Sequence, residues 1–193
     1  MPASATRQSI VETADRLFYE RGFEATSFAD IAAGLGLSRG NFYYHFKTKD
    51  DILDAVIARR IAGTRAMLDA WARDGDDPRA RILGFVHLLI ANRAPIMAHG
   101  CPAGSLCAEL AKLDHDAQHR AADVLGLFRD WLAEQFRSLG ATEAADDLAV
   151  QLLGWSQGVA VLAAAFRDEA MIRREVAARE RWLAALPHPP SAA

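Results

Sequence analysis

Cysteine is scarce in this chain, with only Cys101 and Cys107 among 193 residues. Two cysteines cannot form the disulfide framework of a small secreted domain, and no basic, apolar leader with a small-residue cleavage site opens the sequence. We therefore expect a reducing, cytoplasmic setting. Long apolar runs are also missing, because the longest, residues 159–166, is far too short to span a bilayer.

Strict alternation of apolar and polar residues, the pattern of a half-buried strand, is absent, and there is no internal repeat. Apolar residues make up 51% of the chain, which is ample for a globular core. They recur at helical spacing, so the sequence predicts an all-α fold. Helices are expected up to Gly22, near residues 27–33 and 38–46, from Thr48 to about residue 73, from Pro78 to before Pro95, up to about Leu113, and near 116–139, 142–166 and 168–186.

Motifs of common enzyme classes are missing as well. The chain has no phosphate-cradling glycine loop, no nucleophile elbow, no catalytic pair of carboxylates and no compelling cysteine–histidine pair. An enzyme is therefore the weaker alternative, and no cofactor is predicted. Histidine and cysteine do gather in the middle of the chain, but their spacing fits no compact metal site; they are His99, Cys101, Cys107, His115 and His119.

The net charge of −3 does not indicate a general polyanion binder, but the charge is unevenly distributed. Residues 36–49 contain Arg39, Lys47 and Lys49, one histidine and no acidic residue, whereas the acidic excess lies beyond the first sixty residues. A local cationic edge on an acidic body favours DNA binding through a small, defined surface.

The segment from Ser27 onward predicts two short helices joined by a tight glycine turn. Ser27 and Asp30 form a capping box that opens the first helix. Residues 34–36 supply the turn, and Ser38 is a good N-cap for the second helix. This spacing is typical of a helix-turn-helix, whose second helix lies in the major groove of DNA. The alternatives are an ordinary part of a helical bundle and an aromatic surface that binds protein.

The same region resembles the N-terminal domain of the tetracycline-repressor (TetR) family of transcriptional regulators. The resemblance covers residues 7–57 without gaps. It is carried by LFYERGFEATSFADIA at residues 17–32 and by GLSRGNFYYHFKTKDDIL at residues 36–53. Beyond this region the resemblance extends only to the order of the helices.

This resemblance implies two functional domains. A three-helix DNA-binding domain is expected at residues 1–50, and a larger effector-binding and dimerisation domain at residues 51–187. Residues 188–193 are rich in proline and are expected to form a flexible tail.

By position, the resemblance also implies roles around the second helix of the motif. Arg39 and Gly40 would face bases, because arginine can donate two hydrogen bonds to guanine and glycine lets the backbone approach closely. Asn41 would lie close by, while Phe42 and Phe46 are assigned to the core. The other contacts would go to phosphates or sugars, which fix register without reading sequence; they are Thr26, Ser27, Tyr43, Tyr44, His45 and Lys49.

A small-molecule effector is expected among the middle helices, again from the resemblance. Bulky aromatic side chains mixed with a few polar groups fit a largely apolar ligand. The alternative is ordinary core, because apolar residues at helical spacing usually pack together. The candidates are Phe85, His87, Asn92, Cys101, Phe128, Trp131, Trp155 and Gln157.

Cys101 precedes Pro102, which is predicted to start a helix, so the cysteine would occupy its N-cap. The helix dipole and free amides there favour a reactive thiolate. Residues 100–106 also resemble a branch of the family that includes sensors of electrophiles and oxidants. The alternative is an unreactive, packed cysteine.

A two-fold dimer is expected, because one recognition helix per subunit gives too little contact for a specific operator. The resemblance favours an interface built from the last two long helices. The candidates are Leu152, Leu153, Gly154, Gly158, Val161 and Leu162, with Ile172, Val176 and Leu183 as a partner stripe. Packing within one chain is the alternative for any of them.

The sequence thus predicts a ligand-responsive transcriptional regulator that binds a palindromic double-stranded operator as a homodimer and does not enter a membrane. Repression is the family expectation, and activation is the alternative. We expect an effector to shift the fourth helix and thereby the separation of the two recognition helices.

Overall fold

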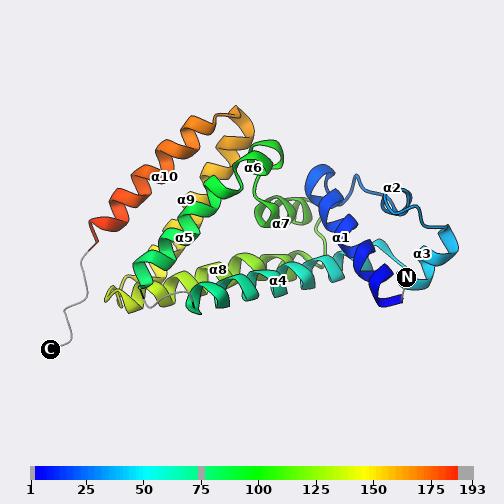
Figure 1. The fold of residues 1–193 in the computed structure, drawn as a ribbon, viewed down its shortest axis with the longest axis horizontal. Helices are drawn as coiled ribbons and strands as arrows, with labels where there is room; N and C mark the ends of the chain where they lie inside the picture. Colours follow the sequence, from blue (N-terminus) through cyan, green and yellow to red (C-terminus); the bar gives the residue numbers. More distant parts are fainter. Residues whose placement is uncertain (1–2, 74–76, 187–193) are drawn as a thin grey trace. The chain divides into compact units, whose positions relative to one another are not determined.

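The computed structural model describes residues 3–73 and 77–186, in which it contains ten α-helices and no strand (Figure 1). The all-α prediction is confirmed, while the predicted tail at residues 188–193 lies outside the described part. The helices are α1 (Ala3–Arg21), α2 (Phe28–Ala33), α3 (Arg39–His45), α4 (Lys49–Arg73), α5 (Pro78–Ala91), α6 (Arg93–His99), α7 (Pro102–Lys112), α8 (Gln118–Ser138), α9 (Ala145–Phe166) and α10 (Glu169–Ala184).

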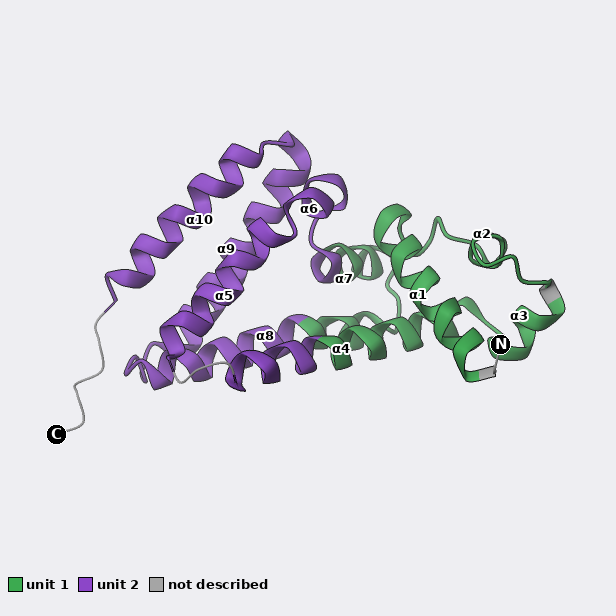
Figure 2. Ribbon diagram, viewed as in Figure 1, with its two compact units in different colours: residues 1–63, 105–124 green, residues 64–104, 125–193 purple. Residues whose placement is uncertain are grey.

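The chain divides into two compact units (Figure 2). Unit 1 comprises residues 1–63 and 105–124, and unit 2 comprises residues 64–104 and 125–193. Helices α4, α7 and α8 each begin in one unit and end in the other. The compact units therefore share helices, and the functional domain boundary after residue 50 stays a prediction.

The core of unit 1 explains this division. It is built from α1, α2, α3 and the first half of α4, and parts of α7 and α8 complete it. The residues contributed from beyond position 100 are Leu106, Leu110, Ala117 and Ala121, all at most 5% exposed. Burial of these apolar side chains ties residues 105–124 to the N-terminal helices, because apolar surface is stabilised by removal from water.

Unit 2 has a separate apolar core. Helix α5 packs against α10, and α6 packs against α9. Aromatic pairs join α8 to both α5 and α10, with ring centroids 5.4 Å apart for Phe85 and Phe128 and 6.2 Å apart for Phe136 and Trp182. Such edge and tilted pairs add packing energy beyond area burial.

Helix α6 is a feature that the sequence did not predict. Pro95 indicated the end of a helix, and α5 does end before it, at Ala91. A new helix, α6, nevertheless starts at Arg93, and Pro95 is the third residue of this helix. Proline is tolerated in a first turn, because the backbone N–H groups there have no partner within the helix.

Candidate nucleic-acid interface

Helices α2 and α3 are joined by a short turn, and each begins with the predicted cap. The Ser27 hydroxyl accepts a hydrogen bond from the Asp30 backbone N–H, and the Asp30 carboxylate accepts one from the Ser27 N–H at 2.8 Å. The Ser38 hydroxyl accepts one from the Asn41 N–H at 3.4 Å. Gly36 has a φ of +63°, a left-handed conformation that glycine tolerates best. Both predicted caps and the glycine turn are confirmed.

Two phenylalanines, one helical turn apart, anchor α3 to the core of unit 1. Phe42 is 1% exposed and Phe46 is 2% exposed, as predicted. The ring centroid of Phe42 lies 5.1 Å from that of Phe28 in α2. The Arg7 guanidinium of α1 lies 4.7 Å from the centroid of the Phe46 ring. Helix α3 is therefore held on its inner face by contacts with both α1 and α2.

The outer face of α3 presents aromatic and polar groups to solvent. Tyr44 is 72% exposed and Tyr43 is 43% exposed, and Gly40 and Asn41 are exposed beside them. No atom lies within 4 Å of the position that a Cβ would take at Gly40, so a partner can approach the backbone there. His45 is half-buried, with its ring 5.1 Å from that of Tyr44. This face is free within the chain for contact with another molecule.

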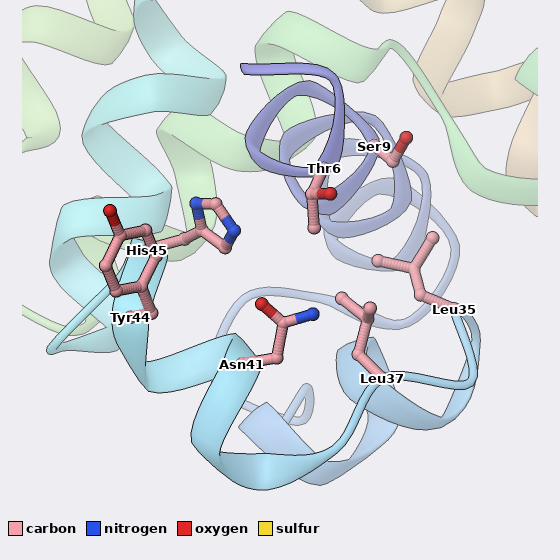
Figure 3. Close-up of a pocket in the computed structure, with 7 residues that line it drawn as sticks. All are labelled: Thr6, Ser9, Leu35, Leu37, Asn41, Tyr44 and His45. Carbon is pink, nitrogen blue, oxygen red and sulfur yellow. The ribbon is translucent and has the colours of Figure 1, made fainter. Parts of the chain in front are cut away.

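A hollow of about 300 Å³ lies between α1 and α3 (Figure 3). It brings three predicted DNA-binding residues together with hydroxyl groups of α1 and two leucines of the turn; the lining residues are Thr6, Ser9, Leu35, Leu37, Asn41, Tyr44 and His45. Hydroxyl, amide and imidazole groups can donate hydrogen bonds to phosphate oxygens. The sequence analysis did not single out Thr6 or Ser9; the Ser9 hydroxyl donates its hydrogen bond to the Ala5 carbonyl within α1 at 3.1 Å.

Thr26 does not offer its side chain to DNA. It is 1% exposed, and its hydroxyl donates a hydrogen bond to the Gly22 carbonyl at 2.7 Å. The predicted phosphate contact of this side chain is wrong, because the hydroxyl is buried in the turn that follows α1. Ser27 is exposed, but its hydroxyl donates to the Asp30 carboxylate within the α2 cap.

Lys49 is likewise engaged within the chain. Its ammonium donates to the carbonyl oxygens of Phe23 at 3.1 Å and Glu24 at 3.3 Å, and lies 3.7 Å from the Glu24 carboxylate. It also lies 4.3 Å from the centroid of the Phe23 ring. These hydrogen bonds use two of the three donors of the ammonium group. The phosphate contact of Lys49 stays a prediction.

Two carboxylates of this region, those of Asp30 and Asp51, cap helices. Hydrogen bonds from Thr48 hold the pKa of Asp51 below its usual value. Hydrogen bonds from Ser27 do the same for the pKa of Asp30. Arg39, the predicted base-reading residue, is the first residue of α3, and its side chain lies outside the described part of the structure.

Four of the predicted effector residues are aromatic and lie in or against the core of unit 2. Phe85 and Phe128 pack against each other, as described above. Trp131 packs instead against Trp71, with centroids 5.5 Å apart. The indole N–H of Trp155 donates to a carboxylate of α10 at 3.1 Å. Ordinary core packing accounts for these contacts as well as a ligand site does, so the effector assignment stays a prediction.

Two polar candidates of the effector site engage neighbouring groups. His87 is exposed, and its Nε2 lies 2.6 Å from the Glu180 carboxylate of α10. Asn92 is exposed at the end of α5, where its amide donates to the Leu88 carbonyl at 2.9 Å. These contacts do not bring His87 or Asn92 into one site with the aromatic candidates.

Cys101 and Gln157 lie close to the same glycine. The Cys101 sulfur accepts a hydrogen bond from the Gly104 N–H at 3.5 Å, and α7 begins at Pro102, so the predicted N-cap is confirmed. The Gln157 carboxamide of α9 approaches Gly104 so closely that an added Cβ would collide with its oxygen. The structure therefore brings these two effector candidates to one place in unit 2.

Helix α9 exposes a stripe of apolar and glycine residues. No atom lies within 4 Å of the Cβ positions of Gly154 and Gly158. Val161 is 66% exposed, and Phe166 is 68% exposed. Exposed apolar patches of this kind mark interaction surfaces. The exposed stripe consists of Val150, Gly154, Gly158, Val161, Leu162 and Phe166.

The opposite face of α9 belongs to the core. Leu152 is 0% exposed in the single chain, and so are Ile172 and Leu183 of α10, while Val176 is 1% exposed. These residues cannot form a contact stripe for a second subunit, so that part of the interface prediction is wrong. Leu153 is half-buried.

By length and composition, α9 would also be able to cross a membrane. Seven of its residues are buried in unit 2, however, as expected for the core helix of a globular unit. Among the described residues, no cluster of three or more histidine, cysteine, aspartate or glutamate side chains could hold a metal ion.

The family model described as bacterial regulatory proteins, tetR family, matches residues 10–56. The transcriptional regulator TtgR of Pseudomonas putida is 44% identical over 55 residues, which are 28% of this chain and 26% of that protein. The transcriptional repressor DhaR of Mycobacterium sp. (strain GP1) is 25% identical over 132 residues, which are 68% of this chain and 64% of that protein. The chain therefore matches less than two thirds of the length of either relative.

The whole chain is similar in fold to a TetR transcriptional regulator of Legionella pneumophila. The TM-score is 0.82 at 23% identity, and the alignment covers 92% of this chain and 96% of that one. This likeness extends through both units, whereas the family model matches the region of the helix-turn-helix. Residues 10–56 of the chain are therefore similar to the tetR family of bacterial regulatory proteins, and the chain as a whole shares the fold of solved TetR regulators.

Proposed function

We propose that this protein is a repressor that binds a palindromic operator as a homodimer and leaves it when a small effector binds. The observation that carries the proposal is the outer face of α3. This face exposes Tyr43 and Tyr44 to solvent, while Phe42 and Phe46 fix the helix to the core from beneath. A rigid helix with polar and aromatic groups on its free face suits the major groove of DNA.

Within this proposal the contacts divide into two classes. Arg39 and Gly40 at the start of α3 read bases, with Asn41 beside them. Tyr43, Tyr44 and His45 contact phosphates or sugars, and the Thr6 hydroxyl in the hollow between α1 and α3 adds to this set. Phosphate contacts fix the register of the helix and supply affinity without reading sequence.

The exposed stripe of α9 supports the homodimer. Glycine allows close approach of two helices, and the empty space around Gly154 and Gly158 leaves room for a second chain. Val161 and Leu162 would be removed from water in such an interface, which stabilises it. A two-fold dimer places its recognition helices about 34–36 Å apart, or a multiple of that distance, to meet successive major grooves.

The effector and its coupling complete the proposal. The candidates in unit 2 suit a largely apolar or an electrophilic molecule, and Cys101 would be the nucleophile toward the latter. Helix α4 is continuous from unit 1 into unit 2, so an effector that favours one conformation of unit 2 can change the position of α3. The effector must bind the two conformations with different affinities for this to occur. Such a regulator would act in the cytoplasm.

A titration of the purified protein against DNA tests the proposal. A duplex from the region upstream of the protein's own gene is compared with a scrambled duplex at several salt concentrations. We expect tighter binding to the upstream duplex, a footprint with two-fold symmetry, and one dimer per site by light scattering. Arg39→Ala should reduce affinity by about 1–3 kcal/mol for the upstream duplex alone. Equal affinity of the wild-type protein for both duplexes would contradict the proposal.

A further inference from the structure

The backbone of Phe23 and Glu24, in the turn between α1 and α2, is held from two sides. Its two N–H groups point to one carboxylate, and its two carbonyl oxygens point to one ammonium group. The carboxylate belongs to Glu109 of α7 and the ammonium to Lys49 of α4. We call these four hydrogen bonds the Phe23–Glu24 clamp. The sequence analysis did not single out Glu109.

The Glu109 half of the clamp uses both carboxylate oxygens. The Phe23 N–H donates to Oε2 and the Glu24 N–H donates to Oε1, each at 2.9 Å. Hydrogen bonds to an ionised carboxylate are shorter and stronger than those between neutral groups. Glu109 lies 86 residues after Phe23 in the sequence, so the clamp joins α7 to the N-terminal helices of unit 1.

The local backbone is shaped to admit this carboxylate. Gly22 has a φ of +96°, which side chains disfavour, and it ends α1. A Cβ at Gly22 would lie only 2.9 Å from the Glu109 Oε1. The Phe23 side chain, 2% exposed, packs edge-on against Phe18 and His115 at centroid distances of 5.2 and 5.3 Å. The turn therefore combines a buried ring with a backbone held by charged groups.

The position of the clamp connects it to α3. Helix α2 begins at Phe28, four residues after Glu24, and Ile31 is its buried residue. With so little buried surface of its own, α2 depends on the turn before it for its placement. Phe28 of α2 packs in turn against Phe42 of α3. Hydrogen bonds that fix the turn after α1 therefore also help to fix α2, against which α3 packs.

We propose that Glu109 is a positioning residue for DNA recognition, which holds the turn between α1 and α2 so that α3 is presented in one orientation. This inference rests on the proposed operator binding. Helix α7, which carries Glu109 in unit 1, is capped by Cys101 of unit 2. Loss of the clamp reduces the fraction of molecules with α3 correctly placed, and apparent affinity falls in proportion to that fraction.

The clamp itself is tested in the free, full-length protein by NMR. Glu109→Gln keeps the shape of the side chain but removes its charge, and Glu109→Asp shortens it by one methylene. Both variants should move the amide proton resonances of Phe23 and Glu24 upfield and raise their hydrogen-exchange rates about tenfold, because charged acceptors protect amides most strongly. Glu134→Gln, an exposed position on α8, is the matched control for the charge. Unchanged Phe23 and Glu24 signals in both Glu109 variants would overturn the inference.

The role in recognition is tested by the ratio of affinities for operator and scrambled duplexes. Glu109→Gln should weaken operator binding about tenfold. Binding to the scrambled duplex should stay unchanged, because it depends on phosphate charge alone. Glu134→Gln should leave both affinities as in the wild type. An unchanged ratio for Glu109→Gln, or an equal loss on both duplexes, would overturn the inference.

The two proposals fail in different ways. If the wild-type protein does not distinguish the duplexes, the proposed function is wrong, and the role of Glu109 in recognition falls with it. If the wild type distinguishes them and Glu109→Gln distinguishes them equally well, only the inference about Glu109 is wrong. A variant that unfolds is recognised by the collapse of its amide spectrum, and Glu109→Asp then decides the question.

Discussion

Helices α3 and α9 both expose large side chains, but their free faces differ in chemistry. The face of α3 carries tyrosine hydroxyls, an amide and an imidazole beside its aromatic rings, and α3 follows a segment without acidic residues. The face of α9 is aliphatic, is interrupted by two glycines, and carries a single aromatic ring at its end. The first suits a charged, hydrated partner such as DNA, and the second suits a dry contact with another copy. Exposure alone therefore does not identify a partner, whereas exposure combined with hydrogen-bonding capacity does.

The largest expected effect comes from placing a charge on the aliphatic face. Val161→Glu should convert the dimer to a monomer, because an unpaired carboxylate is costly to bury in an interface. Operator affinity should then fall by about 100-fold or more, since two linked recognition helices become one. Light scattering and a DNA titration measure the two effects. Leu113→Glu, an exposed leucine in unit 1, is the matched control and should stay dimeric. A dimeric Val161→Glu protein would remove the distinction drawn between the two faces.

The second prediction compares the two faces of α9 itself. Leu152→Ala should lower the free energy of unfolding by about 2–5 kcal/mol, because it leaves a cavity in the core of unit 2. Leu162→Ala, at an exposed position, should change it by about 0.5 kcal/mol or less. Urea denaturation in the Val161→Glu background keeps subunit dissociation out of the measurement. Similar losses at both positions would show that α9 is buried on both sides.

The third prediction concerns the hydroxyl of Tyr44, which lines the hollow between α1 and α3. Tyr44→Phe removes one donor and should cost about 0.5–1.5 kcal/mol of binding free energy. The loss should be equal for operator and scrambled duplexes, because a phosphate contact carries no sequence information. A fluorescence titration of both duplexes checks this. A loss confined to the operator would make Tyr44 a base-reading residue.

The smallest effect is expected from the capping carboxylates. The pKa of Asp51 is lowered in the folded protein from its usual 3.8, mainly by hydrogen bonds from Thr48. A carboxylate whose pKa is lower in the folded than in the unfolded protein stabilises the fold at pH values above its unfolded pKa. This stabilisation is lost as the pH falls through the folded pKa. Asp51→Asn should therefore flatten the decline in stability below about pH 3.8. The urea midpoint measured against pH shows it, and identical slopes for variant and wild type would refute it.

Most of unit 1 could be predicted from the sequence, because its determinants are local. The capping pairs, the glycine turn and the spacing of Phe42 and Phe46 all lie within a few residues of the structure that they specify. Thr26 was assigned wrongly because the partner of its hydroxyl depends on how the chain folds back at Gly22. Glu109 was missed for the same reason, since nothing near position 109 indicates a partner 86 residues away.

Unit 2 could be predicted only in outline. Helical spacing gave the helices, but a stripe of apolar residues looks alike whether it meets the core, a ligand or another subunit. Leu152 and Val161 lie on one helix and are both aliphatic, yet one is buried and the other is exposed. The packing of α5, α6 and α10 against α9 separates them, and that packing is a property of the whole unit.

The sharing of α4, α7 and α8 between the units limits how the protein can be taken apart. A fragment that stops at residue 63 would contain all of the helix-turn-helix but would lose Leu106 and Leu110 from beneath it, together with Glu109. To transfer unit 1 to another protein, both of its segments, residues 1–63 and 105–124, would have to be moved. This would require cutting the chain at three places. A graft of residues 1–63 alone would leave the core of unit 1 incomplete, and its transferred helices would expose the apolar side chains that residues 105–124 now cover.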